Sequence, residues 1–119
     1  PGVEYFDTFI KVHTTTFVLS IMLAMTGIIL GGIPAKFPDL KLGFFEAGVG
    51  WIPFWLERMD EEWEMRRSEA PLLKNKPSEY CTAGNIFTAA KPKRKAWRMP
   101  STSSARTTSS GPVITRIGT

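Results

Sequence analysis

The run from Phe37 to Glu64 places an extended segment, a glycine turn and an amphipathic helix in immediate succession. Leucine and phenylalanine dominate residues 40–45, which is typical of a short strand that is buried on both faces. Residues 46–50 interrupt this strand with two glycines, and glycine reaches backbone angles that are closed to other residues. Pro53 stands where the first turn of a helix accepts it. The run therefore predicts one βα unit with a carboxylate, Glu46, at the carboxyl end of its strand.

The helix after the turn has an apolar stripe with three- and four-residue spacing, formed by Ile52, Trp55, Leu56, Met59 and Trp63. Acidic side chains take its other side, and the sequence predicts that Asp60, Glu61 and Glu62 form a solvated face, paired in part with Arg66 and Arg67. Upstream, residues 9–13 form a strand-like run that ends in His13, followed by a long apolar segment. Chemistry in α/β folds is placed at strand ends, so His13 and Glu46 are the first candidate site residues.

These segments resemble a known family. The run FPDLKLGFFEAGVGWIPFWLERMDEEWE is followed by APLL and KPSEY, and FIKVH is followed by a segment that ends in ILGGIPAKFPDLK. Together they closely resemble the amidohydrolase-related family over residues 5–80. Its members are metal-dependent TIM barrels, among them aminocarboxymuconate-semialdehyde decarboxylase and resorcylate decarboxylases. The resemblance implies an α/β fold, a partial TIM (β/α)8 barrel with two βα units.

The resemblance also implies roles for single residues. His13 matches a metal-ligand or substrate-facing histidine, although its spacing alone favours a surface histidine. Glu46, in EAG, takes the place of a histidine that decarboxylase members carry in an HGG-type turn; it is our catalytic candidate, and a partner for free N–H groups at the following helix is the alternative. Trp51 is a candidate wall of the substrate pocket, with helix packing as its alternative. The family's His-x-His pair and its final aspartate, in a motif like WASDYPH, are missing.

The missing ligands limit the expected activity. One histidine cannot hold a catalytic metal, because such sites usually use three protein ligands. We therefore expect a divalent metal, zinc above all, in the parent family but not retained by this chain. The expected function is that of a fragment of a metal-dependent hydrolase or non-oxidative decarboxylase of small carboxylated or cyclic substrates, inactive alone. A TIM barrel needs about 250 residues, so we expect exposed strand edges that favour self-association.

Charge divides the chain into two parts. Residues 1–80 hold eight Lys and Arg and all eleven Asp and Glu, a net charge of −3, whereas residues 81–119 hold seven Lys and Arg and no acid. We expect the second part to be a disordered, low-complexity basic tail, because it has little apolar surface to bury. Its run from Lys91 to Arg98 makes a polyanion-binding peptide one alternative function, although we expect no specific nucleic-acid partner.

The tail also reads as a second family motif in a shifted reading frame. Joining the third base of each codon from Ser110 to Ile117 to the first two bases of the next codon permits WASDYPH. We infer a one-base frameshift between Tyr80 and Gly84, so that residues 81–119 are out-of-frame translation. Coding DNA that cannot spell WASDYPH in the shifted frame would disprove this hypothesis.

A membrane role is the remaining alternative. Residues 16–33 contain no charged side chain, and Lys11 and Lys36 flank them. This length lies at the lower limit for a transmembrane helix, so a single-pass segment with a basic tail is one interpretation. A buried helix of an α/β protein is the other, and we favour it because of the resemblance. We therefore expect no membrane partner and, since no signal peptide is visible, a cytoplasmic location. The single cysteine, Cys81, excludes an intrachain disulfide.

Overall fold

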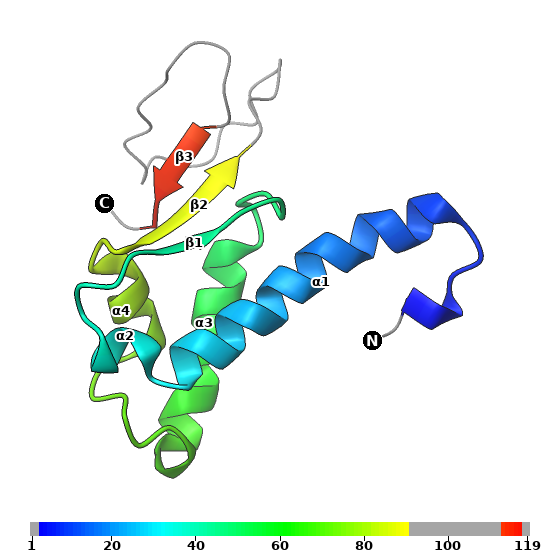
Figure 1. The fold of residues 1–119 in the computed structure, drawn as a ribbon. Helices are drawn as coiled ribbons and strands as arrows, with labels where there is room; N and C mark the ends of the chain where they lie inside the picture. The colour runs from blue at the N-terminus through cyan, green and yellow to red at the C-terminus, as the bar shows by residue number, and fades with distance from the viewer. Residues whose placement is uncertain (1–2, 91–112, 118–119) are drawn as a thin grey trace.

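The computed structural model describes residues 3–90 and 113–117 (Figure 1). The helices are α1 (Phe9–Leu30), α2 (Ile33–Lys36), α3 (Ile52–Met65) and α4 (Pro77–Thr82), with 3-10 turns at Val3–Tyr5 and Arg67–Glu69. The strands are β1 (Leu42–Phe44), β2 (Ile86–Ala90) and β3 (Val113–Arg116).

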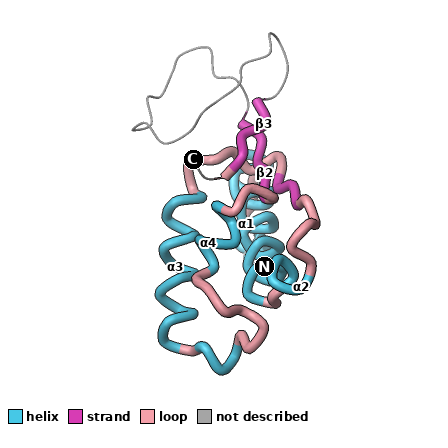
Figure 2. Tube along the Cα trace, turned by 90° about the vertical axis from the view of Figure 1, so that its left-hand side faces the viewer, coloured by secondary structure: helices cyan, strands magenta, loops and turns pink. Residues whose placement is uncertain are grey.

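The strands form one small sheet in the order β1-β2-β3. β1 and β2 are parallel, with Leu42 opposite Ile86, and β2 and β3 are antiparallel, with Phe87 opposite Arg116. Parallel neighbours cannot be joined by a tight turn. The chain therefore crosses from β1 to β2 through α3 and α4, which lie side by side beneath the sheet (Figures 1 and 2).

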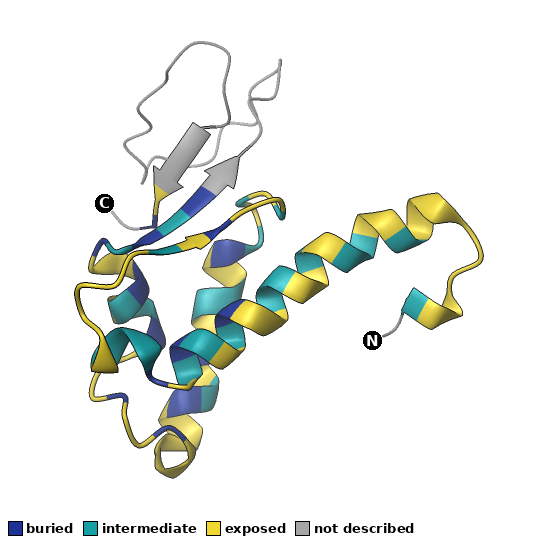
Figure 3. Ribbon diagram, viewed as in Figure 1, coloured by how far each residue is buried: buried dark blue, intermediate teal, exposed yellow. Residues whose placement is uncertain are grey.

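The main core lies between the sheet and the helices. Its buried side chains come from every layer: Met25, Ile29, Phe44, Ile52, Met59, Cys81, Ile86 and Ile117. From α1, Met25 and Ile29 are buried in this core, and Ile21, Ile28 and Leu30 pack against it while partly exposed. The rest of α1 projects away from the other helices and is mostly exposed (Figure 3).

Two glycines end α1. The N–H of Gly31 donates to the Gly27 carbonyl, and Gly32 follows with a φ of 78°, a left-handed angle that glycine adopts without steric cost. Leu72 packs so closely that a β-carbon on Gly32 would lie 2.5 Å from its Cβ. Both the angle and the packing therefore require glycine at this point.

Asp60 joins α3 to α4. Its carboxylate accepts hydrogen bonds from the Ser78 N–H at 2.9 Å and from the Ser78 hydroxyl at 2.5 Å. This contact satisfies a free N–H in the first turn of α4. The prediction that Asp60 belongs to a solvated face is therefore wrong, because the side chain is half-buried and holds two helices together.

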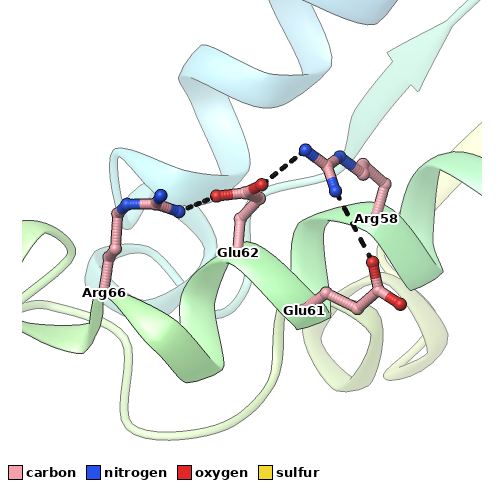
Figure 4. Close-up of polar contacts among 4 residues, drawn as sticks. All are labelled: Arg58, Glu61, Glu62 and Arg66. Atoms are coloured by element: carbon pink, nitrogen blue, oxygen red, sulfur yellow. Dashed lines mark hydrogen bonds and ion pairs between the residues drawn. The ribbon is translucent and has the colours of Figure 1, made fainter.

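The exposed face of α3 carries a row of ion pairs (Figure 4). Arg58 lies 2.5 Å from Glu62 and 3.7 Å from Glu61, and Arg66 pairs with the other oxygen of Glu62. This confirms the predicted pairing of the acidic run with Arg66. Arg67 instead stacks over the Trp63 ring, 4.4 Å from its centroid. Exposed pairs of this kind contribute little to stability, about 0.3–0.5 kcal/mol each.

The predicted fold class, a partial TIM (β/α)8 barrel with two βα units, is wrong. The described chain is mostly helical, with two parallel strands in one small sheet. The unit at β1 and α3 is present, but residues 9–13 are not a strand, since they form the first turns of α1. Within that helix the hydroxyls of Thr14 and Thr16 are satisfied, because they donate to the carbonyls of Ile10 and Val12 one turn earlier.

The prediction of a disordered tail from Cys81 onward is also wrong for the residues that the structure describes. Cys81 belongs to α4, and β2 and β3 follow. Ile86 and Thr88 are each 1% exposed, and Ile117 is 8% exposed. The basic run from Lys91 to Arg98 lies outside the described residues, and the frameshift hypothesis, which concerns the coding DNA, stays a prediction.

Candidate functional site

The loop between β1 and α3 holds the carboxylate that the sequence singled out. Glu46 lies two residues beyond the carboxyl end of β1 and is exposed, with a φ of 73°. Left-handed backbone is uncommon for residues other than glycine and costs roughly 1–2 kcal/mol. Such angles cluster at functional sites, where the surrounding structure maintains them. The unusual backbone angle therefore occurs at the residue that the sequence pattern predicts as a site residue.

The Glu46 carboxylate has no hydrogen-bond or ion-pair partner within the described part of the chain. The alternative role, acceptance of N–H groups near Gly48 to Gly50, is therefore not seen among these residues. An exposed carboxylate at a strand end is free to contact a substrate or a proton donor.

Trp51 closes the same loop. It directly precedes α3 and is half-buried against the main core. Its indole Nε1–H donates to the Gly48 carbonyl at 3.1 Å, and Gly48 itself has a φ of 70°. The hydrogen bond holds the indole ring across the turn. In the structure, Trp51 therefore packs against the core and stabilises the loop. Its predicted contact with a substrate stays a prediction.

His13 lies on α1, in the part of the helix that projects from the body (Figure 1). Its ring is exposed and tilted between two phenylalanines, with centroids 5.1 Å from Phe9 and 5.2 Å from Phe17. Within residues 3–90 and 113–117, no three His, Cys, Asp or Glu side chains come together to hold a metal. The described residues therefore do not fit the expected zinc by themselves, and any such ion would need ligands from outside them.

A cavity of about 430 Å³ lies at the opposite end of the sheet, where β1 and β2 begin. The Tyr80 hydroxyl oxygen accepts the backbone N–H of Lys74 at 3.1 Å beside it. Asn85 also lines the cavity and donates to the Pro38 carbonyl at 2.5 Å. Sequence reasoning missed this cavity. The KPSEY run supplies Tyr80 but gives no sign of a cavity by itself, because the other walls come from distant segments.

Cys81, the single cysteine of the sequence, is a fully buried thiol on α4. Burial raises its pKa to about 12, and the nearby negative charge of Asp60 adds to the shift. A thiol of this kind is inert, because the thiolate is the reactive form. Cys81 is therefore a core side chain.

Comparison with known proteins adds no information on the site. No protein-family model matches the chain, and no curated protein matches it. Among the described residues, α1 is long and apolar enough to cross a membrane by length and composition, and 11% of its most apolar stretch is buried.

Proposed function

We propose that this chain is a segment of a metal-dependent hydrolase or non-oxidative decarboxylase related to the amidohydrolases, with Glu46 as its substrate-facing carboxylate. The observation that carries the proposal is the Glu46 carboxylate, which has no partner among the described residues and stands on left-handed backbone at the carboxyl end of a parallel strand. Strand ends of this kind are where α/β enzymes place their chemistry. The strand and helix on either side of Glu46 supply the resemblance, whereas the EAG run itself departs from the HGG-type turn of the decarboxylase members.

The proposed role of Glu46 is proton transfer or substrate orientation. A carboxylate in hydrogen-bond reach of a substrate accelerates proton transfer by about 10²–10⁴-fold. Small carboxylated or cyclic substrates are the expected class. Because the described residues do not assemble a metal site, we expect the segment to be inactive alone.

The proposal predicts the outcome of a segment exchange. Residues 40–65 would replace the matching strand, turn and helix in an active carboxy-lyase of the amidohydrolase-related family. We expect the chimera to fold and turn over its carboxylated substrate. Glu46→Gln should then lower kcat by about 100-fold or more, because the amide cannot accept the proton.

Glu57→Gln is the matched control, since Glu57 is an exposed carboxylate on α3, away from the loop. Its kcat should equal that of the parent chimera. Circular dichroism and thermal unfolding would establish that all three proteins fold alike. A folded chimera without turnover, or one in which Glu46→Gln and Glu57→Gln behave alike, would contradict the proposal.

A membrane role for α1 is the second candidate, favoured by the length, apolar composition and exposure of that helix. Its 22 residues extend about 33 Å, which matches the hydrocarbon core of a bilayer. However, a spanning helix would have to withdraw Met25 and Ile29 from the main core. The polyanion-binding alternative depends on residues outside the described ranges and stays a prediction.

A further inference from the structure

The cavity where β1 and β2 begin has a wall of accessible apolar side chains. Its volume of about 430 Å³ lies within the roughly 300–1,000 Å³ that is typical of small-molecule sites. Phe37, Leu40 and Leu72 line it and are 49%, 44% and 52% exposed. A ligand that covers these side chains removes apolar surface from water, which stabilises the complex. The wall therefore favours a ligand with an apolar part.

The Tyr80 hydroxyl supplies a hydrogen-bond donor in the same cavity. Its oxygen accepts the backbone N–H groups of Lys74 at 3.1 Å and of Asn75 at 3.4 Å. These bonds use the oxygen lone pairs, and the hydroxyl hydrogen has no acceptor among residues 3–90 and 113–117. An O–H group that accepts hydrogen bonds becomes a stronger donor. The hydroxyl therefore favours a ligand that carries an acceptor oxygen.

Two side chains of opposite charge also line the cavity. Lys74 and Glu79 are both exposed, and within the described part of the chain neither side chain forms an ion pair or a hydrogen bond. The neighbouring cation, Lys76, is already paired: its pKa is raised chiefly by Glu64, which lies 2.5 Å from its ammonium group, and least by Glu79. One cation and one anion beside the same cavity are complementary to a ligand that carries both charges.

We propose that this cavity binds a free apolar α-amino acid in its zwitterionic form. The ligand carboxylate contacts the Lys74 ammonium group and the Tyr80 hydroxyl, and the ligand ammonium group contacts Glu79. The ligand side chain covers the apolar wall. A free amino acid fits better than a peptide terminus, because only the free molecule carries both charged groups on its α-carbon. The proposal goes beyond the proposed function and does not depend on it, since Glu46 follows β1 at the opposite end of the sheet.

Isothermal titration calorimetry of the full chain with L-phenylalanine tests the proposal. We expect a dissociation constant below about 1 mM, as for a small ligand with moderate affinity per atom. 3-Phenylpropanoate lacks the ammonium group and 2-phenylethylamine lacks the carboxylate. Each should bind about tenfold more weakly or worse, because one charge-assisted hydrogen bond is lost. If either compound binds as tightly as L-phenylalanine, the zwitterion is not what the cavity recognises, and the proposal fails.

Two substitutions connect the affinity to the charges of the cavity. Lys74→Gln and Glu79→Gln should each weaken the binding of L-phenylalanine by about tenfold or more. Glu79→Gln should not weaken the binding of 3-phenylpropanoate, which has no ammonium group for Glu79 to contact. Lys41→Gln and Glu57→Gln are the matched controls, since both residues are exposed and neither lines the cavity. The controls should bind like the parent, and all four variants should retain its circular dichroism spectrum.

Nuclear magnetic resonance of the ¹⁵N-labelled full chain tests the location. The amide signals of Lys74 and Asn75 should shift when L-phenylalanine is added, because their N–H groups donate to the Tyr80 oxygen that the ligand contacts. The signals of residues 46–50, at the other end of β1, should stay in place. Shifts confined to residues 46–50, no binding at millimolar concentrations, or an affinity that Lys74→Gln and Glu79→Gln leave unchanged would each overturn the proposal.

Discussion

Replacing Ile29 by alanine should lower the free energy of unfolding by about 2–5 kcal/mol. Ile29 is fully buried where α1 meets the main core, so the smaller side chain removes apolar contacts and leaves a cavity. The free energy of unfolding of a small domain is only about 5–15 kcal/mol, so this substitution would remove a large part of it. Urea unfolding followed by circular dichroism would measure the change as a lower midpoint.

Met65→Ala is the control for this experiment. Met65 ends α3 and is 65% exposed, so its truncation should change the stability by no more than about 0.5 kcal/mol. Equal, small losses in both variants would show that the C-terminal third of α1 is not held in the core. That result would favour the membrane interpretation of α1.

Cys81 should react with an alkylating reagent at least about 100-fold more slowly in the folded chain than in denaturant at pH 8. Burial raises the pKa of the Cys81 thiol to about 12, whereas its ordinary value is 9.0. Since each pKa unit is a tenfold change in the thiolate fraction below the pKa, the folded chain holds very little thiolate. Mass spectrometry of alkylated samples taken over time would give both rates.

The same shift predicts a pH dependence of stability. The unfolded thiol ionises as the pH rises above about 9, whereas the folded thiol stays protonated until about pH 12. Ionisation therefore favours the unfolded chain, and the free energy of unfolding should fall between these pH values. Cys81→Ala should lose this part of the pH dependence. Similar alkylation rates in the folded and denatured chain would contradict the assignment of Cys81 to the core.

The part of the fold that could be predicted depends on local signals. β1 and α3 follow from the apolar run, the glycine turn, Pro53 and the helical spacing, all of which act within a few residues. The prediction of a strand at residues 9–13 is wrong because β-branched side chains such as Ile10 and Val12 also occur in helices when the following turns are helical. At α1, continuity with the long apolar helix outweighed the strand propensity of residues 9–13.

The contacts that needed the structure join distant segments. β2 is held by β1 on one side and β3 on the other, and neither pairing is visible in its own sequence. The excess of basic residues after Cys81 concealed Ile86 and Thr88, whose burial depends on those neighbours. At the candidate site, Glu46 could be found from its place after the strand. Its left-handed backbone could not, because that angle is usual only for glycine.

Three indole rings belong to one helix or its cap. Trp51 precedes α3, Trp55 donates from its Nε1–H to the Thr26 hydroxyl oxygen at 2.9 Å, and Trp63 is buried near the far end. The fourth tryptophan, Trp97, lies outside the described residues, and a Trp97→Phe variant leaves these three as the only indoles. Intrinsic fluorescence of that variant therefore reports how α3 packs on the rest of the chain, because α1 contains no tryptophan. A shift in emission that precedes the loss of helical signal would show α3 detaching while α1 remains coiled.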